Sequence, residues 1–599
     1  MVIRQRTRWI VRLFLGGISS AIYNISPAQE IPQSGYPQGY FRDPLDLPVH
    51  LAGNFGELRP GHFHMGLDIK TNGRTGYPVY AAADGYISHV KIESSGFGNA
   101  IYINHPNGYT TVYVHLDHFI PALEAYVREQ QYKLERWEVY LDIPPDLFPV
   151  KQGQVIAASG NTGGSMAPHL HFEIRDTRAD ENRNPFLFGL PITDNLPPVL
   201  SRLGVYDGNM SAYLQVPRVL PLIRVAGGYT VPGKVVVTHS DRVRLAIGAV
   251  DHQTGSANNL GIYSATVYMD GQRVNGFTLD KFGYQVTRYV NAHTDYSLKT
   301  GGGPYLEYLS PLPGDLLPIY HPVGEDGLLD LNDEAPHAVR IEVKDPYGNT
   351  SVAAFTVRRE GPSPVNDQGD LFLPNQVNVF ENDEFLLYLP EHALYDAVRP
   401  VFEARGGAGP GGIDPRGANP GGASPGGAGA EPGTVAVSPV YSVLSALIPV
   451  QDSFTVSIRP SVPVQDEDTG KYVIFQRGAG SHHVSRVTWS KGWASAKLRD
   501  LGEFRLLRDD SPPEILPLGW KDGAILSGKS SLSVVVKDNL GSVDDFRAEL
   551  DGRWLMFSYK GDVYTYHFDE HFPAGAHSLT ISVSDEAGNT TLHTYHLSR

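Results

Sequence analysis

Short runs of alternating hydrophobic and polar residues, separated by glycine and proline, recur along most of this chain. Such alternation is typical of strands that bury one face. Asn107-Gly108 lies between two of these runs, at 101–103 and 110–114, and predicts a hairpin turn. The stretch 120–136 instead has helical spacing and residues that favour helices. The pattern therefore predicts a mainly β chain that begins with a compact antiparallel β domain carrying a short helical insert.

One pattern occurs twice beyond residue 195. A strand, a turn of sequence Asp-x-x-Gly-Asn and a closing strand span 337–357 and again 577–597. A double proline opens each surrounding stretch, at 197–198 and at 512–513. We interpret the two stretches as immunoglobulin-like β-sandwiches at 196–362 and 511–599.

With 599 residues, the chain is too long for a single hydrophobic core, and we expect several domains. A segment at 406–433 holds twelve glycines and five prolines, and we expect a flexible tether there. The expected organisation is a signal peptide at 1–29, a first globular domain at 30–195 with its insert at about 119–149, a sandwich at 196–362, a β domain at 363–510 interrupted by the tether, and a sandwich at 511–599.

The first residues have the order of an export signal: four arginines up to Arg12, then a modest apolar region to about Ile25. We therefore expect export to the periplasm, the cell envelope or the medium. No later segment has 18 uninterrupted apolar residues, so no membrane span is expected. The net charge of -16 gives a nucleic-acid partner no electrostatic support. The absence of cysteine excludes disulfides and thiolate-bound metals, so any metal must bind His, Asp or Glu.

Two short segments about a hundred residues apart carry candidate chemistry. In the first, His64 and Asp68 are four residues apart, and in the second, His169 and His171 are two apart. On strands, each pair would share one face. If the two strands are neighbours, these side chains converge. Two imidazoles and a carboxylate are the ligand set of a catalytic zinc, with the fourth position left for water.

Several further motifs strengthen the prediction of a zinc site. Residues 55–176 resemble the lysostaphin/LytM-type zinc metallopeptidases, which cut peptide bonds in bacterial peptidoglycan. The resemblance rests on motifs in the family's order: His64-Met65-Gly66-Leu67-Asp68, Gly76-Tyr77-Pro78-Val79-Tyr80-Ala81 with Asp84-Gly85, Gly98-Asn99, Asn107-Gly108-Tyr109, Tyr113-Val114-His115-Leu116, Gly160-Asn161-Thr162-Gly163 and Pro168-His169-Leu170-His171-Phe172-Glu173.

The resemblance implies that His64, Asp68 and His171 bind one Zn²⁺ and that His115 and His169 form the catalytic pair beside it. We favour His169 as general base and His115 as the group that stabilises the oxyanion, but the sequence does not apportion these roles. Tyr113, two residues before His115, is either a further site residue or a packed strand tyrosine.

The function we expect is that of an exported zinc endopeptidase acting on peptidoglycan stems or cross-bridges. Its C-terminal β domains would bind the wall or an envelope protein partner, and the insert at 119–149 would limit access to the cleft. Two alternatives remain open: a protein without catalytic activity that binds the wall or activates a hydrolase, and a multi-domain surface adhesin.

Overall fold

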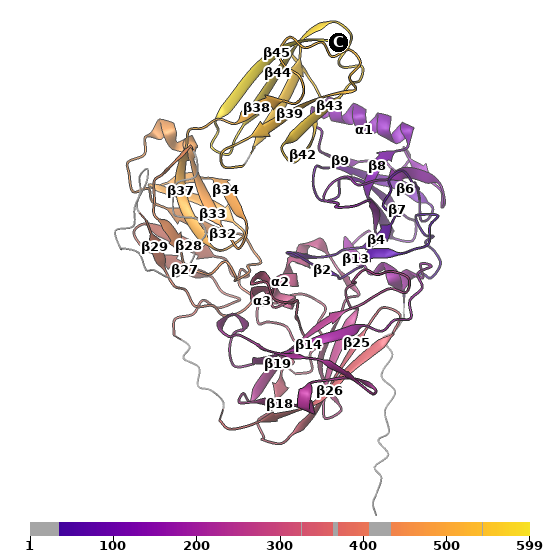
Figure 1. The fold of residues 1–599 in the computed structure, drawn as a ribbon, viewed down its shortest axis with the longest axis vertical. Coiled ribbons are helices and arrows are strands. Elements are labelled where there is room, and N and C mark those ends of the chain that lie inside the picture. The colour runs from indigo at the N-terminus through magenta and orange to yellow at the C-terminus, as the bar shows by residue number, and fades with distance from the viewer. Residues whose placement is uncertain (1–34, 325, 363–368, 407–432, 542) are drawn as a thin grey trace, which may run out of the picture. The chain divides into compact units, whose positions relative to one another are not determined.

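The computed structural model describes residues 35–324, 326–362, 369–406, 433–541 and 543–599. The expected signal peptide at 1–29 and nearly all of the expected tether at 406–433 lie outside these residues. The described residues form mostly antiparallel sheets with few helices, which confirms the predicted mainly β fold (Figure 1). Within them, no helix is both long and apolar enough to cross a membrane.

Residues 38–195, here called the first region, supply all but one strand of a twelve-stranded sheet with the central path β1-β4-β12-β8-β7-β6-β10. Asn107-Gly108 turns β7 into β8 as predicted, with Asn104 opposite Thr110. The strands of this region are β1 (Leu51–Gly53), β4 (Leu67–Lys70), β5 (Pro78–Tyr80), β6 (Gly85–Ile92), β7 (Asn99–Asn104), β8 (Tyr109–Phe119), β9 (Val139–Asp142), β10 (Pro149–Val150), β11 (Val155–Ser159), β12 (His169–Asp176) and β13 (Glu181–Arg183), with the separate pair β2 (Leu58–Arg59) and β3 (His62–Phe63) and the 3-10 helix η1 (Pro185–Phe188).

Helix α1 (Pro121–Leu134) follows β8 directly and confirms the helix predicted at 120–136. Proline at the first turn suits a helix start, because its fixed φ matches the helix and its missing N–H has no partner there anyway. The helix ends at Glu135, which adopts a left-handed φ of 49°. Leu123 and Val127 are buried, so one face of α1 packs on the sheet.

Residues 196–362, the second region, form two sheets, with the paths β15-β14-β19-β23 and β16-β17-β26-β25-β20-β21. The predicted strand-turn-strand unit is present as β25 and β26, with Lys344 opposite Thr350. The elements are β14 (Val199–Asp207), η2 (Ala212–Leu214), β15 (Arg218–Pro221), β16 (Ile223–Val225), β17 (Gly228–Thr230), η3 (Pro232–Lys234), β18 (Val235–Thr238), β19 (Arg242–Val250), β20 (Ser264–Met269), β21 (Gln272–Thr278), β22 (Lys281–Phe282), η4 (Tyr284–Tyr289), α2 (Val290–His293), α3 (Tyr296–Thr300), β23 (Glu307–Tyr308), β24 (Leu329–Asp330), β25 (His337–Lys344) and β26 (Thr350–Arg359).

The described residues between 369 and 509 also build two sheets, with the paths β27-β28-β32-β36-β35 and β29-β31-β37-β33-β34, the latter joined by β30. These strands come from both sides of the expected tether. The elements are β27 (Asn378–Glu381), β28 (Phe385–Leu389), β29 (Glu403–Arg405), β30 (Thr434–Ala436), β31 (Val440–Ser442), β32 (Phe454–Ile458), η5 (Asp466–Lys471), β33 (Tyr472–Arg477), β34 (His482–Arg486), β35 (Thr488–Ser490), β36 (Trp493–Leu498) and β37 (Glu503–Asp509).

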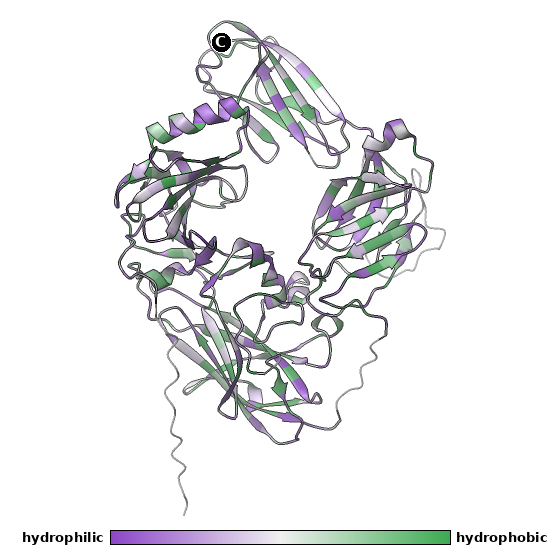
Figure 2. Cartoon of the chain, turned by 180° about the vertical axis from the view of Figure 1, so that it is seen from behind, coloured by the Kyte–Doolittle hydropathy of each residue, from purple (hydrophilic) through white to green (hydrophobic). Residues whose placement is uncertain are grey.

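The last sandwich consists of two four-stranded sheets, β38-β39-β43-β42 and β41-β40-β44-β45, which share one hydrophobic core. Its predicted strand-turn-strand unit is β44 and β45, with Ser584 opposite Thr590. In Figure 2, hydrophobic and hydrophilic residues alternate along single strands, as expected when one face is buried. The strands are β38 (Glu514–Pro517), β39 (Ser531–Lys537), β40 (Asp545–Leu550), β41 (Arg553–Trp554), β42 (Ser558–Lys560), β43 (Val563–His567), β44 (Ala576–Ser584) and β45 (Thr590–Ser598).

Packing crosses the boundary expected at 195–196. Phe55, Phe63 and Met65 of the first region are buried in the same hydrophobic cluster as the core of the second region. Strand β22 of the second region also pairs with β13 of the first. The two regions therefore share one core directly beneath the segment that carries His64.

We predict that Phe63→Ala lowers the free energy of unfolding by about 3–5 kcal/mol, because it opens a cavity in the shared core. Phe63 is fully buried, and its ring lies 5.1 Å from that of Phe282 in the second region. Urea unfolding of the whole chain measures the change. Leu592→Ala, at a side chain 65% exposed, is the control and should change stability little. A similar small effect for both variants would contradict the shared core.

Candidate metal centre

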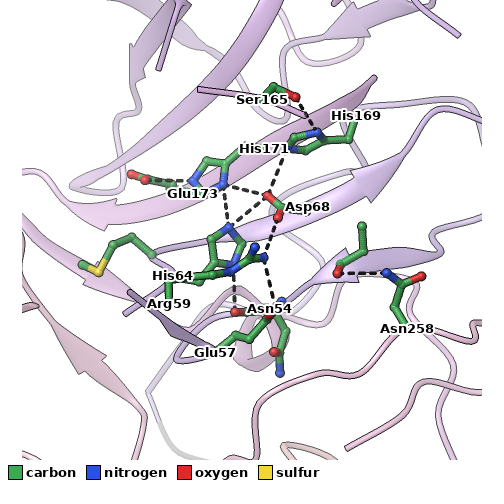
Figure 3. A network of polar contacts seen from close by, with 12 residues as sticks. Asn54, Glu57, Arg59, His64, Asp68, Ser165, His169, His171, Glu173 and Asn258 are labelled. Carbon is green, nitrogen blue, oxygen red and sulfur yellow. Dashed lines mark hydrogen bonds and ion pairs between the residues drawn. The ribbon is translucent and has the colours of Figure 1, made fainter. Parts of the chain in front are cut away.

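Three potential metal ligands converge at one point of the first region. The His64 Nε2 atom lies 2.9 Å from both His171 Nδ1 and Asp68 Oδ1. The His171 Nδ1 atom lies 3.0 Å from the same oxygen. Figure 3 shows the three side chains pointing toward one another. All three residues are buried.

The sheet accounts for the position of two of them. Strand β12 lies between β4 and β8, with His171 opposite Asp68 on one side and Val114 on the other. The two strands are neighbours, as the sequence analysis required. His169 and His171 both lie on β12, as predicted.

His64 does not lie on the strand that carries Asp68, contrary to prediction. It stands in the connection between β3 and β4, which begins at Leu67. Gly66 explains the break, because a Cβ there would lie 2.4 Å from the Phe172 carbonyl oxygen and 2.9 Å from His171 Nε2. A connecting segment that ends in glycine therefore places His64 just before the start of β4.

Hydrogen bonds on the far side of each ring fix which nitrogen faces the centre. The His64 Nδ1 atom lies 2.8 Å from the carbonyl oxygen of Asn54, so it carries the proton. The His171 Nε2 atom lies 3.0 Å from Glu173 Oε1 and is likewise the protonated nitrogen. His64 Nε2 and His171 Nδ1 are therefore the nitrogens directed at the centre, and outer partners of this kind are the usual support of metal-binding histidines.

Glu173 is itself held from two sides. Its carboxylate lies 2.6 Å from the Arg175 guanidinium. It also accepts a hydrogen bond of 2.5 Å from the Tyr284 hydroxyl in η4 of the second region. Burial raises the pKa of Glu173, but the charges of Arg175 and His171 outweigh it and bring that pKa to about 2. The partner of His171 is therefore an ionised carboxylate.

Arg59 approaches Asp68 from the opposite side. Its guanidinium lies 3.2 Å from Asp68 Oδ2 and 3.3 Å from Glu57 Oε2. Burial opposes ionisation of Asp68, yet His64, His169 and His171 hold its pKa well below the usual range. Asp68 is thus an anion whose Oδ1 atom remains directed at the two histidines.

His115 and His169 lie beside the three converging side chains, and their ring centroids are 4.7 Å apart. The His115 Nδ1 atom lies 2.9 Å from the Thr162 carbonyl oxygen. The His169 Nδ1 atom lies 2.8 Å from the Ala167 carbonyl oxygen, and its Nε2 atom lies 3.3 Å from Asp68 Oδ1. The structure thus brings together all five residues named from the sequence.

A bulge in β8 directs His115 toward this group. The residue has a left-handed φ of 63°, which non-glycine residues adopt uncommonly. The pairing of β8 shifts register next to it, against β7 and against β11. Such bulges re-aim side chains, so the period-two rule does not hold through this residue.

Tyr113 is a packed strand tyrosine and not a further site residue. It is fully buried, and its hydroxyl oxygen accepts hydrogen bonds from the Ala82 amide at 2.7 Å and from the Thr111 hydroxyl at 2.9 Å. The bulge at His115 separates the faces of two residues that a regular strand would have kept together.

The donor set fits a divalent metal such as zinc. Two imidazole nitrogens directed at the centre and one carboxylate oxygen are three of the four ligands of a catalytic zinc site. Bonds of about 2.0–2.2 Å to a common centre would place the ligand atoms slightly farther apart than the 2.9–3.0 Å seen between them. Small side-chain movements would suffice for the ion to enter.

The sequence analysis missed the residues that hold the histidines in place. Glu173 alternates with His169 and His171 along β12, and this spacing could have identified it. Asn54 and Thr162 act through backbone carbonyl groups, which any residue type could supply. Tyr284 comes from the second region, and no local spacing relates it to the histidines.

We predict that Tyr113→Phe lowers the free energy of unfolding by about 1–3 kcal/mol, because the buried Ala82 amide loses its acceptor. Metal binding should not change, since the hydroxyl points away from the histidines. Urea unfolding and a metal titration of the same sample test both parts. A variant with normal stability but weakened metal binding would instead indicate that Tyr113 is a residue of the site.

Comparison with known proteins supports the interpretation of the converging histidines and Asp68 as a metal centre. Residues 62–132 and 148–185 match Peptidase family M23, and residues 429–509 match the Zu5-like domain. A DD-carboxypeptidase/endopeptidase Mpg of Neisseria meningitidis is 35% identical over 118 residues, which cover 20% of this chain and 21% of that protein. The murein hydrolase activator NlpD of Salmonella dublin is 36% identical over 122 residues, covering 20% of this chain and 25% of the relative.

The lipoprotein NlpD of Yersinia enterocolitica is covered more fully. It is 36% identical over 103 residues, which make up 17% of this chain and 81% of that sequence. The family-model match, at 62–132 and 148–185, includes the five residues described above. This chain belongs to peptidase family M23.

Proposed function

We propose that this chain is an exported zinc metalloendopeptidase that hydrolyses peptide bonds in the stems or cross-bridges of peptidoglycan. One observation carries the proposal: three ligand atoms meet at 2.9–3.0 Å, with both imidazoles fixed in the tautomer that a metal requires. Similarity to proteins named as murein enzymes or their activators supports the class of substrate.

In this proposal, His64, Asp68 and His171 hold one Zn²⁺. The bound ion would lower the pKa of a water molecule to about 7 and polarise the carbonyl group under attack. The buried carboxylates of Asp68 and Glu173 balance the charge of the cation.

His115 and His169 would transfer the protons of the reaction. Burial, followed by the neighbouring His169 and His171, lowers the pKa of His115 to about 3, so its Nε2 atom presents a lone pair near neutral pH. The His169 Nδ1 atom faces the Ala167 carbonyl oxygen, and its Nε2 atom lies 3.3 Å from Asp68 Oδ1. The lowered pKa of His115 supports it as the proton acceptor, the role favoured for His169 from the sequence.

Hydrolysis then adds one water across the C–N bond. His115 takes a proton from the attacking water, whose oxygen bonds to the carbonyl carbon. The amine leaves with a proton returned from the histidine pair, and the acyl side becomes a carboxylate. The rings return to their initial protonation states.

A second candidate function is activation of a separate hydrolase, because one of the relatives is named a murein hydrolase activator. Catalysis is favoured over this alternative because the set of site residues is complete: His64, Asp68, His115, His169 and His171.

We infer that residues 196–599, with their expected immunoglobulin-like sandwiches at 196–362 and 511–599, contact the wall or an envelope protein. An adhesin role for them is tested by binding of the whole chain to wall fragments without digestion.

The insert at 119–149 remains a candidate for control of access to the cleft. Its helix α1 begins two residues after β8, the strand that carries His115. Deletion of 120–144 with unchanged rate and substrate range would exclude this role, provided that the fold survives.

We predict that His171→Ala loses stoichiometric zinc and lowers the rate of peptidoglycan digestion by at least about a thousandfold, because the centre loses a ligand. Zinc analysis of the purified protein and mass analysis of products from defined peptidoglycan fragments measure both effects. His118→Ala, at a side chain 62% exposed, is the control. Full activity in a zinc-free His171→Ala protein would refute the proposal.

We predict that His115→Ala and His169→Ala each keep about one zinc per chain but lose about 10²–10⁴-fold in turnover, the usual range for a proton-transfer group. The same assay and zinc analysis distinguish these variants from His171→Ala. A wild-type chain that binds zinc but cuts no fragment would instead favour the alternative function, activation of a separate hydrolase.

A further inference from the structure

Three aspartates, one at the end of the first region and two in the second, form a compact group away from the proposed zinc centre. Asp194 lies in the segment before β14, Asp251 directly follows β19, and Asp345 begins the turn between β25 and β26. Each offers a carboxylate oxygen within 4.8 Å of the others. Among the residues that the structure describes, none of these carboxylates forms an ion pair with a basic side chain.

The Asp251 side chain is the unusual member. The residue is 2% exposed, and its Oδ1 atom has no hydrogen-bond partner within the described part of the chain. Burial, together with the charge of Asp345 and then that of Asp194, raises the pKa of Asp251 to about 8. A buried carboxylate with one oxygen unpartnered, beside two further carboxylates, is an unfavourable place for a negative charge unless a cation accompanies it.

The other two carboxylates are held in place by the backbone around them. Asp194 Oδ1 accepts hydrogen bonds from the amides of Leu196 and Thr254 at 3.2 and 3.0 Å. Asp345 Oδ1 accepts hydrogen bonds from the Asn349 amide at 2.9 Å, and its Oδ2 from the Asn349 side chain at 2.6 Å. Three separate chain segments thus present preplaced oxygen atoms to one point.

The last sandwich repeats this arrangement. Asp509, Asp538 and Asp585 also have carboxylate oxygens within 4.8 Å of one another, before its first strand, after β39 and in the turn between β44 and β45. Asn589 donates to the Asp509 carbonyl oxygen at 3.1 Å, as Asn349 does to that of Asp194 at 3.5 Å. The Asp-x-x-Gly-Asn turn therefore brings acidic side chains together at the entrance of both modules.

We propose that Asp194, Asp251 and Asp345 bind a calcium ion. All the donors are oxygen atoms, which hard cations prefer. Two ligand atoms of one Ca²⁺ ion are at most about 5.2 Å apart, and the carboxylate oxygen atoms of the group lie within 4.8 Å of one another. Mg²⁺ is less suited, because it demands near-ideal octahedral geometry and keeps several waters.

The ion bound by Asp194, Asp251 and Asp345 would stabilise the contact between the first two regions. The segment after Asp251 is bound to the first region by Gln253, which accepts from the Leu51 amide at 2.9 Å and donates to the Val49 carbonyl oxygen at 2.7 Å. Gly261 exchanges two hydrogen bonds with the Asn54 side chain, at 2.8 and 2.9 Å. The Asn54 carbonyl oxygen in turn accepts from His64, so the aspartate group anchors the loop that supports this histidine (Figure 3).

The test is a calcium titration of the whole chain. Metal is removed with a chelator, one equivalent of Zn²⁺ is restored, and CaCl₂ is added while heat and the thermal midpoint of unfolding are followed. We expect about one calcium ion per chain, with saturation below about 5 mM, the range of extracellular calcium modules. Absence of binding and of any thermal shift in the wild-type chain would overturn the proposal, and tighter binding of Mg²⁺ would overturn the choice of calcium.

Asp251→Asn separates cation binding from a purely structural role. Without calcium, this variant should melt at or above the wild-type temperature, because it removes one buried negative charge. With calcium, it should lose the bound ion and the thermal shift that depends on it. Asp383→Asn, at an exposed position, is the matched control. An Asp251→Asn protein that keeps wild-type calcium binding would overturn the proposal.

Discussion

The two hydrogen bonds that fix the imidazole rings of His64 and His171 are the constraint on which the candidate centre depends. The sheet brings β4 and β12 together, but it does not decide which ring nitrogen faces Asp68. The Asn54 carbonyl oxygen and the Glu173 carboxylate decide it, by taking the proton on the outer side of each ring. Without them, three buried polar side chains would meet with no preferred protonation, and no defined place for a cation would exist.

Both partners are in turn positioned by the second region. Gly261 binds the side chain of Asn54, and Tyr284 binds the carboxylate of Glu173. The histidines thus belong to the peptidase sheet, while the groups that orient them are braced from outside it. This division agrees with the single hydrophobic core that the two regions share.

Much of this arrangement was accessible from the sequence because it follows from local rules. Alternation placed His169 and His171 on one face, Asn107-Gly108 marked the hairpin, and the repeated Asp-x-x-Gly-Asn turn marked two related modules. Local rules failed where the chain departs from regular geometry. His64 lies outside the strand, and a left-handed residue at His115 separates its face from that of Tyr113.

The contacts that Tyr284 and Gly261 of the second region make with the candidate centre could not be predicted from local patterns. Tyr284 and Gly261 have ordinary local surroundings, and only the folded chain brings them to Glu173 and Asn54. The sequence patterns therefore identify the residues that carry the chemistry but not most of the residues whose hydrogen bonds orient them.

The placement of Phe55, Phe63 and Met65 in the core of the second region has an evolutionary consequence. A gene rearrangement that joined residues 38–195 to an unrelated partner module would expose three large apolar side chains and remove the hydrogen bonds that hold Asn54 and Glu173 in place. The first two regions must consequently be inherited as a single unit.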